Sequence, residues 1–339
     1  MNTLTLTSDA EAMEAPSAAV DGRGFVHLND LLADPSFIQL LEAHELTSLE
    51  AIFNYESGER LGKSGLGGWR VRIRVSLDAV LPGAVSDFGT GSNRNMTEIE
   101  SASEPKIEAR MPRVVYLKRF ENPPPGEQRR ARASSTARSL AGVEWEWIRR
   151  LTDDGIACPR GIALGEEIVG HNERRSALIM DAVPGESLEC WCERWHQEGQ
   201  IGGALTKRRL LEALADFIAL FHGKGYVHRD LYLSHVFFDP DAAPERALHL
   251  IDLQRVKRPR WRRWRWVVKD LASLNYSTPA GSASRSDRLR WLKRYLGAVE
   301  LDRTTKRIAH AVVRKTRRIA RHDRRRAGGR TFSRKRGLS

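Results

Sequence analysis

The chain has 339 residues, a length that suits two lobes and a sizeable core. Its formal net charge is +13, but residues 301–339 hold fifteen Lys/Arg and only two Asp, so the rest of the chain is neutral overall. The basic character therefore belongs to a tail and not to the whole surface. Three cysteines without metal-ligand spacing, and no apolar run of about 18 residues, argue against a disulfide scaffold and a membrane span.

The first part of the chain predicts a leader followed by a strand. Residues 1–23 are rich in Ala, Ser and Glu, and we expect them to be disordered. Residues 69–77 alternate apolar and polar, which predicts a half-buried antiparallel strand. Glycines in front of such a strand allow backbone N–H groups to approach phosphates, although a plain hairpin turn also needs glycine. The candidate phosphate-binding glycines are Gly62, Gly65, Gly67 and Gly68.

A second strand carries a candidate functional lysine. Residues 82–111 predict a long loop outside the core, and residues 112–120 predict a strand rich in β-branched and aromatic side chains. Alternation places Val114, Tyr116 and Lys118 on one face, which would line a cleft. A solvated lysine at a strand end is the alternative.

The middle of the chain predicts a loop, a helix and a short strand. The prolines at 123–125 and the polar run to residue 138 favour a loop, and residues 139–151 favour a helix that ends at Asp154-Gly155. Residues 177–180 predict a short buried strand. Pro184-Gly185 shortly afterwards is typical of a turn.

The most informative stretch is residues 226–238, together with residues 248–253. Asp230 stands in a His-Arg-Asp turn, His235 follows five residues later, and Asp252 lies 22 residues beyond Asp230 between apolar neighbours. Phosphoryl transfer needs a carboxylate that orients the attacking hydroxyl and further ligands for metal ions on the phosphates. A helix predicted over 205–221 would hold this turn rigidly.

These motifs resemble the protein-kinase-like fold and, within it, the lipopolysaccharide kinase (Kdo/heptose kinase, InaA-like) family. His235 stands where protein kinases place Asn, and residues 251–255 (Ile-Asp-Leu-Gln-Arg) replace Asp-Phe-Gly. The resemblance implies an α+β, two-lobed fold with a small antiparallel-sheet N-lobe and a mainly helical C-lobe. The implied division is residues 1–23 as a leader, 24–181 as the nucleotide-binding N-lobe, 182–300 as the C-lobe and 301–339 as the basic tail.

The resemblance also implies roles for individual residues. Asp230 would orient the acceptor hydroxyl, and His235 and Asp252 would hold the metal. Lys118 would hold the α- and β-phosphates, with Glu144 as its ion-pair partner and Glu146 as the alternative. The backbone of Asp181 and Val183 would read the adenine edge, and Asp270 would brace the catalytic loop. The implied cofactors are ATP and Mg²⁺.

The function expected from the resemblance is ATP-dependent phosphorylation of a sugar hydroxyl in a lipopolysaccharide-core-like or other lipid-linked envelope glycan. The protein would be cytoplasmic, on the inner face of the plasma membrane. The absence of a glycine after Leu253 disfavours the backbone flip of a regulated Ser/Thr protein kinase, which is the first alternative. A non-catalytic basic scaffold is the second.

Two basic segments bear on the partner. Residues 257–266 interleave Arg and Lys with Trp, a pattern that suits nucleic acid, an anionic membrane surface or an anionic glycan. The resemblance implies that this segment sits where kinases bind the acceptor, which favours the membrane surface and the glycan. The tail from Arg303 has a few apolar residues at helical spacing. We expect a disordered or weakly helical segment there, in preference to a lipid-bound helix or an RNA-binding arm.

Overall fold

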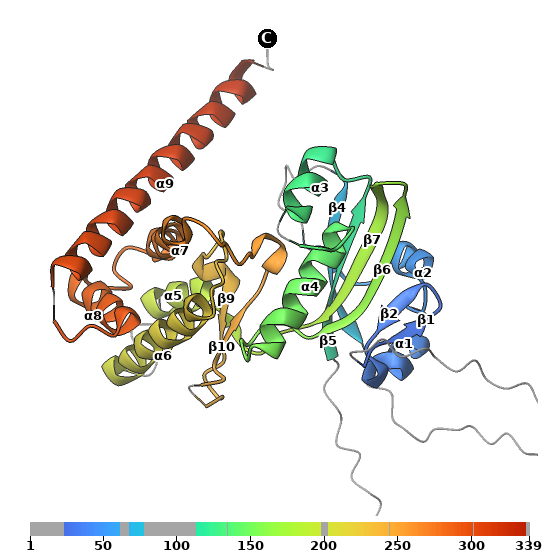
Figure 1. Cartoon of the computed structure of the whole chain (residues 1–339), viewed down its shortest axis with the longest axis horizontal. Coiled ribbons are helices and arrows are strands. Elements are labelled where there is room, and N and C mark those ends of the chain that lie inside the picture. The colour runs from blue at the N-terminus through green and yellow to red at the C-terminus, as the bar shows by residue number, and fades with distance from the viewer. Residues whose placement is uncertain are drawn as a thin grey trace, which may run out of the picture.

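The computed structural model describes residues 24–61, 68–77, 113–133, 135–197, 203–243, 245–300 and 302–336. They form a sheet-containing lobe and a mainly helical lobe (Figure 1). The predicted leader, the predicted loop at 82–111, and three of the four candidate glycines lie outside the described residues: Gly62, Gly65 and Gly67.

The N-lobe is built on a seven-stranded antiparallel sheet with the order β1-β2-β6-β7-β5-β4-β3. The two strands predicted from alternation become the neighbours β4 and β5, and the buried strand predicted at 177–180 is the end of β7. In sheet order, the strands are β1 (Val26–Leu28), β2 (Leu31–Ala33), β6 (Gly161–Val169), β7 (Asn172–Asp181), β5 (Arg113–Glu121), β4 (Arg70–Leu77) and β3 (Glu59–Arg60).

Helices cover both faces of this sheet (Figure 1). On one face, α1 (Ile38–Ala43), which follows the short 3-10 helix η1 (Pro35–Phe37), and α2 (Leu49–Asn54) pack on the odd-numbered residues of β4. On the other face lies α4 (Leu140–Asp153), where the Ser139 hydroxyl accepts a hydrogen bond from the N–H of Gly142 at 2.8 Å and begins the helix. The pleat therefore turns the even-numbered side chains of β4 toward α4 and the C-lobe.

The loop predicted over residues 123–138 is wrong in part, because α3 (Pro125–Arg132) forms there. Proline is tolerated in the first turn of a helix, where its missing N–H has no helical partner. Ala131 is buried against the core, and the Arg132 guanidinium donates to the carbonyl oxygen of His171 at 2.6 Å. Tertiary contacts thus stabilise a helix that the proline run alone does not indicate.

The C-lobe combines helices with a three-stranded sheet of order β10-β9-β8. Its elements are β8 (Glu186–Ser187), α5 (Leu188–Gln197), α6 (Gly203–Gly223), the 3-10 helix η2 (Leu233–His235), β9 (Val236–Phe238), β10 (Leu248–Leu250), the 3-10 helix η3 (Leu253–Arg255), α7 (Arg263–Ser277), α8 (Arg285–Leu296) and α9 (Arg303–Arg336). The predicted helix at 205–221 is α6, and its apolar face packs into the core. Among the described residues, no helix is long and apolar enough to cross a membrane.

The tail differs from the expectation of a disordered or weakly helical segment, because it forms the long helix α9 (Figure 1). Ile308 and Val312, four residues apart, are buried against the C-lobe. The Thr316 hydroxyl accepts a hydrogen bond from the side-chain amide of Asn275 in α7 at 3.0 Å. One face of the helix is therefore part of the C-lobe core, and the arginines of residues 303–325 are exposed on the remaining faces.

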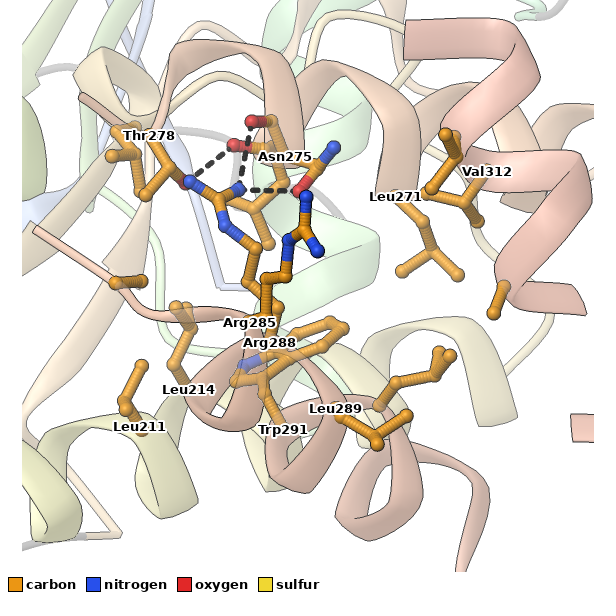
Figure 2. A pocket seen from close by; sticks show the side chains of 16 residues that line it. Leu211, Leu214, Leu271, Asn275, Thr278, Arg285, Arg288, Leu289, Trp291 and Val312 are labelled. Atoms are coloured by element: carbon orange, nitrogen blue, oxygen red, sulfur yellow. Dashed lines mark hydrogen bonds between the residues drawn. The ribbon is translucent and has the colours of Figure 1, made fainter. Parts of the chain in front are cut away.

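Helices α6, α7, α8 and α9 surround an apolar cavity of about 350 Å³. Figure 2 shows Leu211 and Leu214 on one side and Leu271 and Val312 on another, while Arg288 points toward Asn275. The Arg288 guanidinium donates to the backbone carbonyl of Asn275 at 3.2 Å and also to its side-chain oxygen. The docking of α9 thus completes the wall of this cavity.

Candidate active site

The catalytic loop is held by one buried carboxylate, as predicted for Asp270. Its two oxygens accept hydrogen bonds from the backbone N–H groups of His228 and Arg229, each at 2.7 Å. Asp270 is fully buried, and Arg229 has a φ of +73°, a conformation that costs energy for a residue with a Cβ. The imidazole of His228 is also fully buried and lies 3.0 Å from the carbonyl oxygen of Ile251. These contacts fix the backbone that presents Asp230.

Two cations contact the Asp230 carboxylate. The Arg255 guanidinium donates to one oxygen at 2.5 Å, and the Lys269 ammonium lies 3.4 Å from the other. Burial lowers the pKa of Lys269, although the Asp230 charge acts in the opposite direction. The sequence interpretation missed both residues. The sequence does indicate both residues by their position: Lys269 directly precedes Asp270, which braces the loop. Arg255 is the last residue of the Ile-Asp-Leu-Gln-Arg motif.

Asp252 lies at the junction of the two lobes and adopts a left-handed backbone conformation with φ of +58°. Its carboxylate is within 3.4 Å of Arg70, 3.6 Å of Arg72 and 3.7 Å of Lys118. Burial by itself would raise the pKa of Asp252, but these three cations outweigh burial and hold its pKa well below the usual range. Asp252 is therefore an anion at neutral pH.

His235 presents one ring nitrogen to Asp252. Its Nδ1 lies 2.8 Å from the backbone carbonyl of Asp230, so Nδ1 carries the hydrogen and donates it. In the neutral ring the lone pair is on Nε2, which is 3.7 Å from an Asp252 oxygen. No cluster of three or more His, Cys, Asp or Glu side chains suited to a metal occurs in the described part of the chain. The imidazole and carboxylate fit a divalent ion whose other ligands come from phosphate and water, which is how proteins usually bind Mg²⁺.

Lys118 and Glu144 form a buried ion pair between β5 and α4. The Lys118 ammonium donates to the Glu144 carboxylate at 2.5 Å, and the N–H of Leu253 donates to the same oxygen at 3.2 Å. Glu146, the alternative partner, instead accepts hydrogen bonds from Thr136 and pairs with Arg150. The structure thus brings Lys118, Glu144 and Asp252 together although they come from three separate motifs.

The predicted adenine-reading residues lie where β7 leaves the N-lobe. The Asp181 side chain pairs with Arg113 at 3.0 Å, and the Asp181 N–H donates to the carbonyl oxygen of Arg160 at 2.9 Å. Val183 is half-buried two residues further on. Gly185 has a φ of +73°, and a Cβ on it would lie 2.0 Å from the carbonyl oxygen of Phe238, so glycine is required in this turn.

The last candidate glycine, Gly68, immediately precedes Trp69 and β4. A Cβ on Gly68 would meet nothing within 4 Å, so packing alone does not require glycine there.

The basic and aromatic segment at residues 257–266 divides into two parts. Trp266 is half-buried, with the Lys257 ammonium 3.6 Å from its ring centre and Arg229 and Arg265 each at 5.2 Å. Trp261 and Trp264 are 85% and 48% exposed. Trp261 and Trp264 are therefore the more exposed tryptophans of this segment, whereas the ring of Trp266 is in contact with three cations.

These features define a protein-kinase-like fold. The sheet-containing lobe carries the lysine–glutamate pair, and the helical lobe carries the braced His-Arg-Asp turn and the second aspartate. The solved structure "WaaP in complex with acyl carrier protein" has this fold, with a TM-score of 0.58, 23% identity, and coverage of 85% of this chain and 98% of that chain. The chain belongs to the lipopolysaccharide kinase (Kdo/WaaP) family, whose sequence model matches residues 128–295.

Two relatives carry the description lipopolysaccharide core heptose(I) kinase WaaP. The protein from Pseudomonas aeruginosa is 32% identical over 159 residues, which cover 46% of this chain and 59% of the relative. A protein from Escherichia coli is 34% identical over 163 residues, covering 47% of this chain and 60% of the relative. The chain thus spans about three fifths of the length of the relatives it matches.

Proposed function

We propose that this protein is an ATP-dependent kinase that phosphorylates a sugar hydroxyl of a lipopolysaccharide-core-like or other lipid-linked envelope glycan. The observation that carries the proposal is the meeting of Lys118, Glu144 and Asp252, with contacts of 2.5 Å and 3.7 Å. A lysine held by a glutamate beside a metal-binding aspartate is the arrangement that positions nucleotide phosphates in kinases. The relatives described as heptose(I) kinases support a sugar as the acceptor.

Asp230 accepts the proton of the acceptor hydroxyl in this proposal. Its carboxylate is oriented by Arg255 at 2.5 Å, and the loop that carries it is held by Asp270. Lys269, 3.4 Å from the same carboxylate, supplies positive charge next to the oxygens of the transferring phosphoryl group. Positioning and electrostatic stabilisation of this kind account for most of the rate of phosphoryl transfer.

His235 and Asp252 would hold the divalent metal, Mg²⁺ in the usual case, which would neutralise charge on the β- and γ-phosphates. The hydrogen bond from His235 Nδ1 to the Asp230 carbonyl keeps Nε2 available as a ligand. The backbone of Asp181 and Val183 would contact the adenine. Gly68, together with Gly62, Gly65 and Gly67, would let the backbone approach the phosphates.

A lipid-linked acceptor requires the protein to work at a membrane surface, and we include this in the proposal. Trp261 is 85% exposed and Trp264 48% exposed, and both stand among arginines in the sequence. Indole side chains favour the headgroup region, and each nearby Lys or Arg contributes about 1 kcal/mol on anionic lipid. The arginines of α9 would add to this attraction. We expect binding to anionic vesicles that weakens as salt shortens the Debye length.

The deciding experiment is transfer of radiolabelled phosphate from ATP to extracted envelope glycolipid, with a generic protein substrate in parallel. We expect label in the glycolipid, and none when Asp230 is replaced by Asn. Label in the protein substrate alone would favour a Ser/Thr protein kinase, and no label in either would favour a non-catalytic scaffold.

Vesicle sedimentation tests the membrane component separately. The double variant Trp261→Ala/Trp264→Ala should lose binding to anionic vesicles. Leu220→Ala, which removes an apolar side chain 46% exposed on α6, is the control and should not. Equal sedimentation with neutral vesicles, or preferential binding to RNA, would contradict the membrane component.

A further inference from the structure

Strand β4 carries arginine at three alternate positions: Arg70, Arg72 and Arg74. Alternate residues share a face, and the residues between and after them (Ile73, Val75 and Leu77) are buried in the core on the opposite face. The arginines therefore face α4 and the C-lobe. Arg72 pairs directly across the sheet with Lys118, the proposed phosphate-binding lysine.

Two of these arginines reach across to the other lobe. The guanidinium groups of Arg70 and Arg72 lie 3.4 Å and 3.6 Å from the two oxygens of Asp252, although Arg70 and Asp252 are 182 residues apart in the sequence. Their side chains are 12% and 31% exposed. Arg74 is 46% exposed and lies 4.0 Å from Glu59, so it belongs to the edge of the sheet and not to this cluster.

The cluster holds more positive charge than its carboxylates neutralise. Three cations, Arg70, Arg72 and Lys118, share the carboxylates of Asp252 and Glu144. The Nε atoms of both arginines are also buried without a hydrogen-bond partner in the described residues. Buried charge and buried donors without partners are costly, and a divalent ion on Asp252 would add to the excess. The cluster therefore favours binding of a multiply charged anion with several acceptor oxygens.

We infer that Arg70 and Arg72 bind the phosphates of the nucleotide. The inference rests on the proposed kinase function and adds a pair of binding residues to that site. In the nucleotide-free protein Asp252 stands in for the anion. When the nucleotide binds, the guanidinium groups turn from Asp252 to its phosphates, because their planar forks match phosphate oxygens in bidentate pairs. This arrangement supplies phosphate contacts that do not depend on the metal.

The competing explanation is that the two arginines only tie the lobes together through Asp252. In that case their loss would weaken the binding of adenosine, ADP and ATP by similar factors. If they bind phosphate, their loss matters only for ligands that carry phosphates. The ratio of ATP affinity to adenosine affinity therefore separates the two explanations.

The test is calorimetric titration of the full chain with adenosine, ADP and ATP, first in EDTA and then with Mg²⁺. In EDTA, the wild-type protein should bind ATP more tightly than adenosine. Arg72→Gln should weaken ATP binding about tenfold, as expected for the loss of one charge-assisted contact, and leave adenosine binding within about twofold. Arg74→Gln is the matched control on the same strand, and it should keep the wild-type ratio.

Arg72→Lys covers the case in which Arg72→Gln does not fold. It keeps the charge and removes the fork, so it should show a smaller loss in the same direction. A folded Arg72 variant with the wild-type ratio of ATP to adenosine affinity overturns the inference and leaves the kinase proposal standing. A wild-type protein that binds none of the three ligands overturns both.

Discussion

Replacing Asp270 by Asn should damage both the stability of the C-lobe and the geometry of the catalytic loop. The carboxylate accepts two backbone N–H groups, from His228 and Arg229, each at 2.7 Å. Asparagine has nearly the same shape but only one acceptor oxygen. Whichever way its amide is turned, one of the two N–H groups faces an NH₂ group in a fully buried position.

The magnitude follows from these contacts. A hydrogen bond to a charged group contributes about 1.5–3 kcal/mol, and a buried donor left unsatisfied adds a penalty of similar size. We therefore expect the free energy of unfolding to fall by about 3 kcal/mol. Arg229, with its φ of +73°, is then free to relax, and Asp230 moves with it. A displacement of about 1 Å costs roughly 10²-fold in transfer rate.

Urea unfolding, followed by tryptophan fluorescence, measures the first effect, and the phosphate-transfer assay measures the second. Asp302→Asn is the control, because Asp302 accepts a backbone N–H from Thr305 at 2.7 Å but is exposed to solvent. That substitution should cost about 1 kcal/mol or less, with no change in transfer. A folded Asp270→Asn protein with the urea midpoint of the Asp302 variant and the wild-type rate would refute the reasoning.

Three further predictions concern the nucleotide site, a buried acid and a turn. Asp252→Asn should lower the rate of phosphate transfer by roughly 10³-fold or more while leaving adenosine binding measurable by calorimetry. A near-normal rate of transfer would contradict the role of Asp252 as a metal ligand. Burial raises the pKa of Glu173 from 4.5 to about 7, so its stabilising contribution is complete below pH 4.5 and is lost as pH rises through about 7. Glu173→Gln should flatten the fall in thermal midpoint across that interval, and a slope like that of the wild type would argue against the raised pKa. Gly185→Ala should lower the free energy of unfolding by ~2 kcal/mol or more, because its Cβ would lie 2.0 Å from the Phe238 carbonyl oxygen. Gly170→Ala, also at positive φ but with nothing within 4 Å, should cost only about 1 kcal/mol in the same urea titration, and equal losses would contradict the steric explanation.

The residues that could be predicted from the sequence are those whose chemistry is local in the chain. Asp230 and His235 lie in one short turn flanked by apolar residues. Asp252 follows β10, and the antiparallel pairing of β10 with β9 returns the chain to His235. Lys118 and the even-numbered residues of its strand share a face because the side-chain period of a strand is two. The bracing role of Asp270 was also predicted, and two hydrogen bonds confirm it.

The choice between Glu144 and Glu146 depended on the tertiary structure. Two residues along an α-helix point in directions about 200° apart, so only one of them can face the cleft. Which one does so depends on how α4 is rotated against the sheet, and the packing of Trp145, Trp147 and Ile148 into the core decides this. The sequence contains both glutamates and no local feature that distinguishes them.

Long-range packing also decided two other features that the sequence left open, the structure of the tail and the contacts of the β4 arginines. The sequence of the basic tail by itself predicts a poorly ordered segment. In the folded protein α9 is a stable helix, because Ile308 and Val312 pack against the C-lobe. Arg70 and Arg72 are ordinary strand arginines until the fold brings Asp252 to within 3.4 Å and 3.6 Å of them. Local patterns predicted the His-Arg-Asp turn and the strand lysine of this protein. Long-range packing decided which charges meet, because contact between residues so distant in the chain is a property of the folded core and not of any one segment.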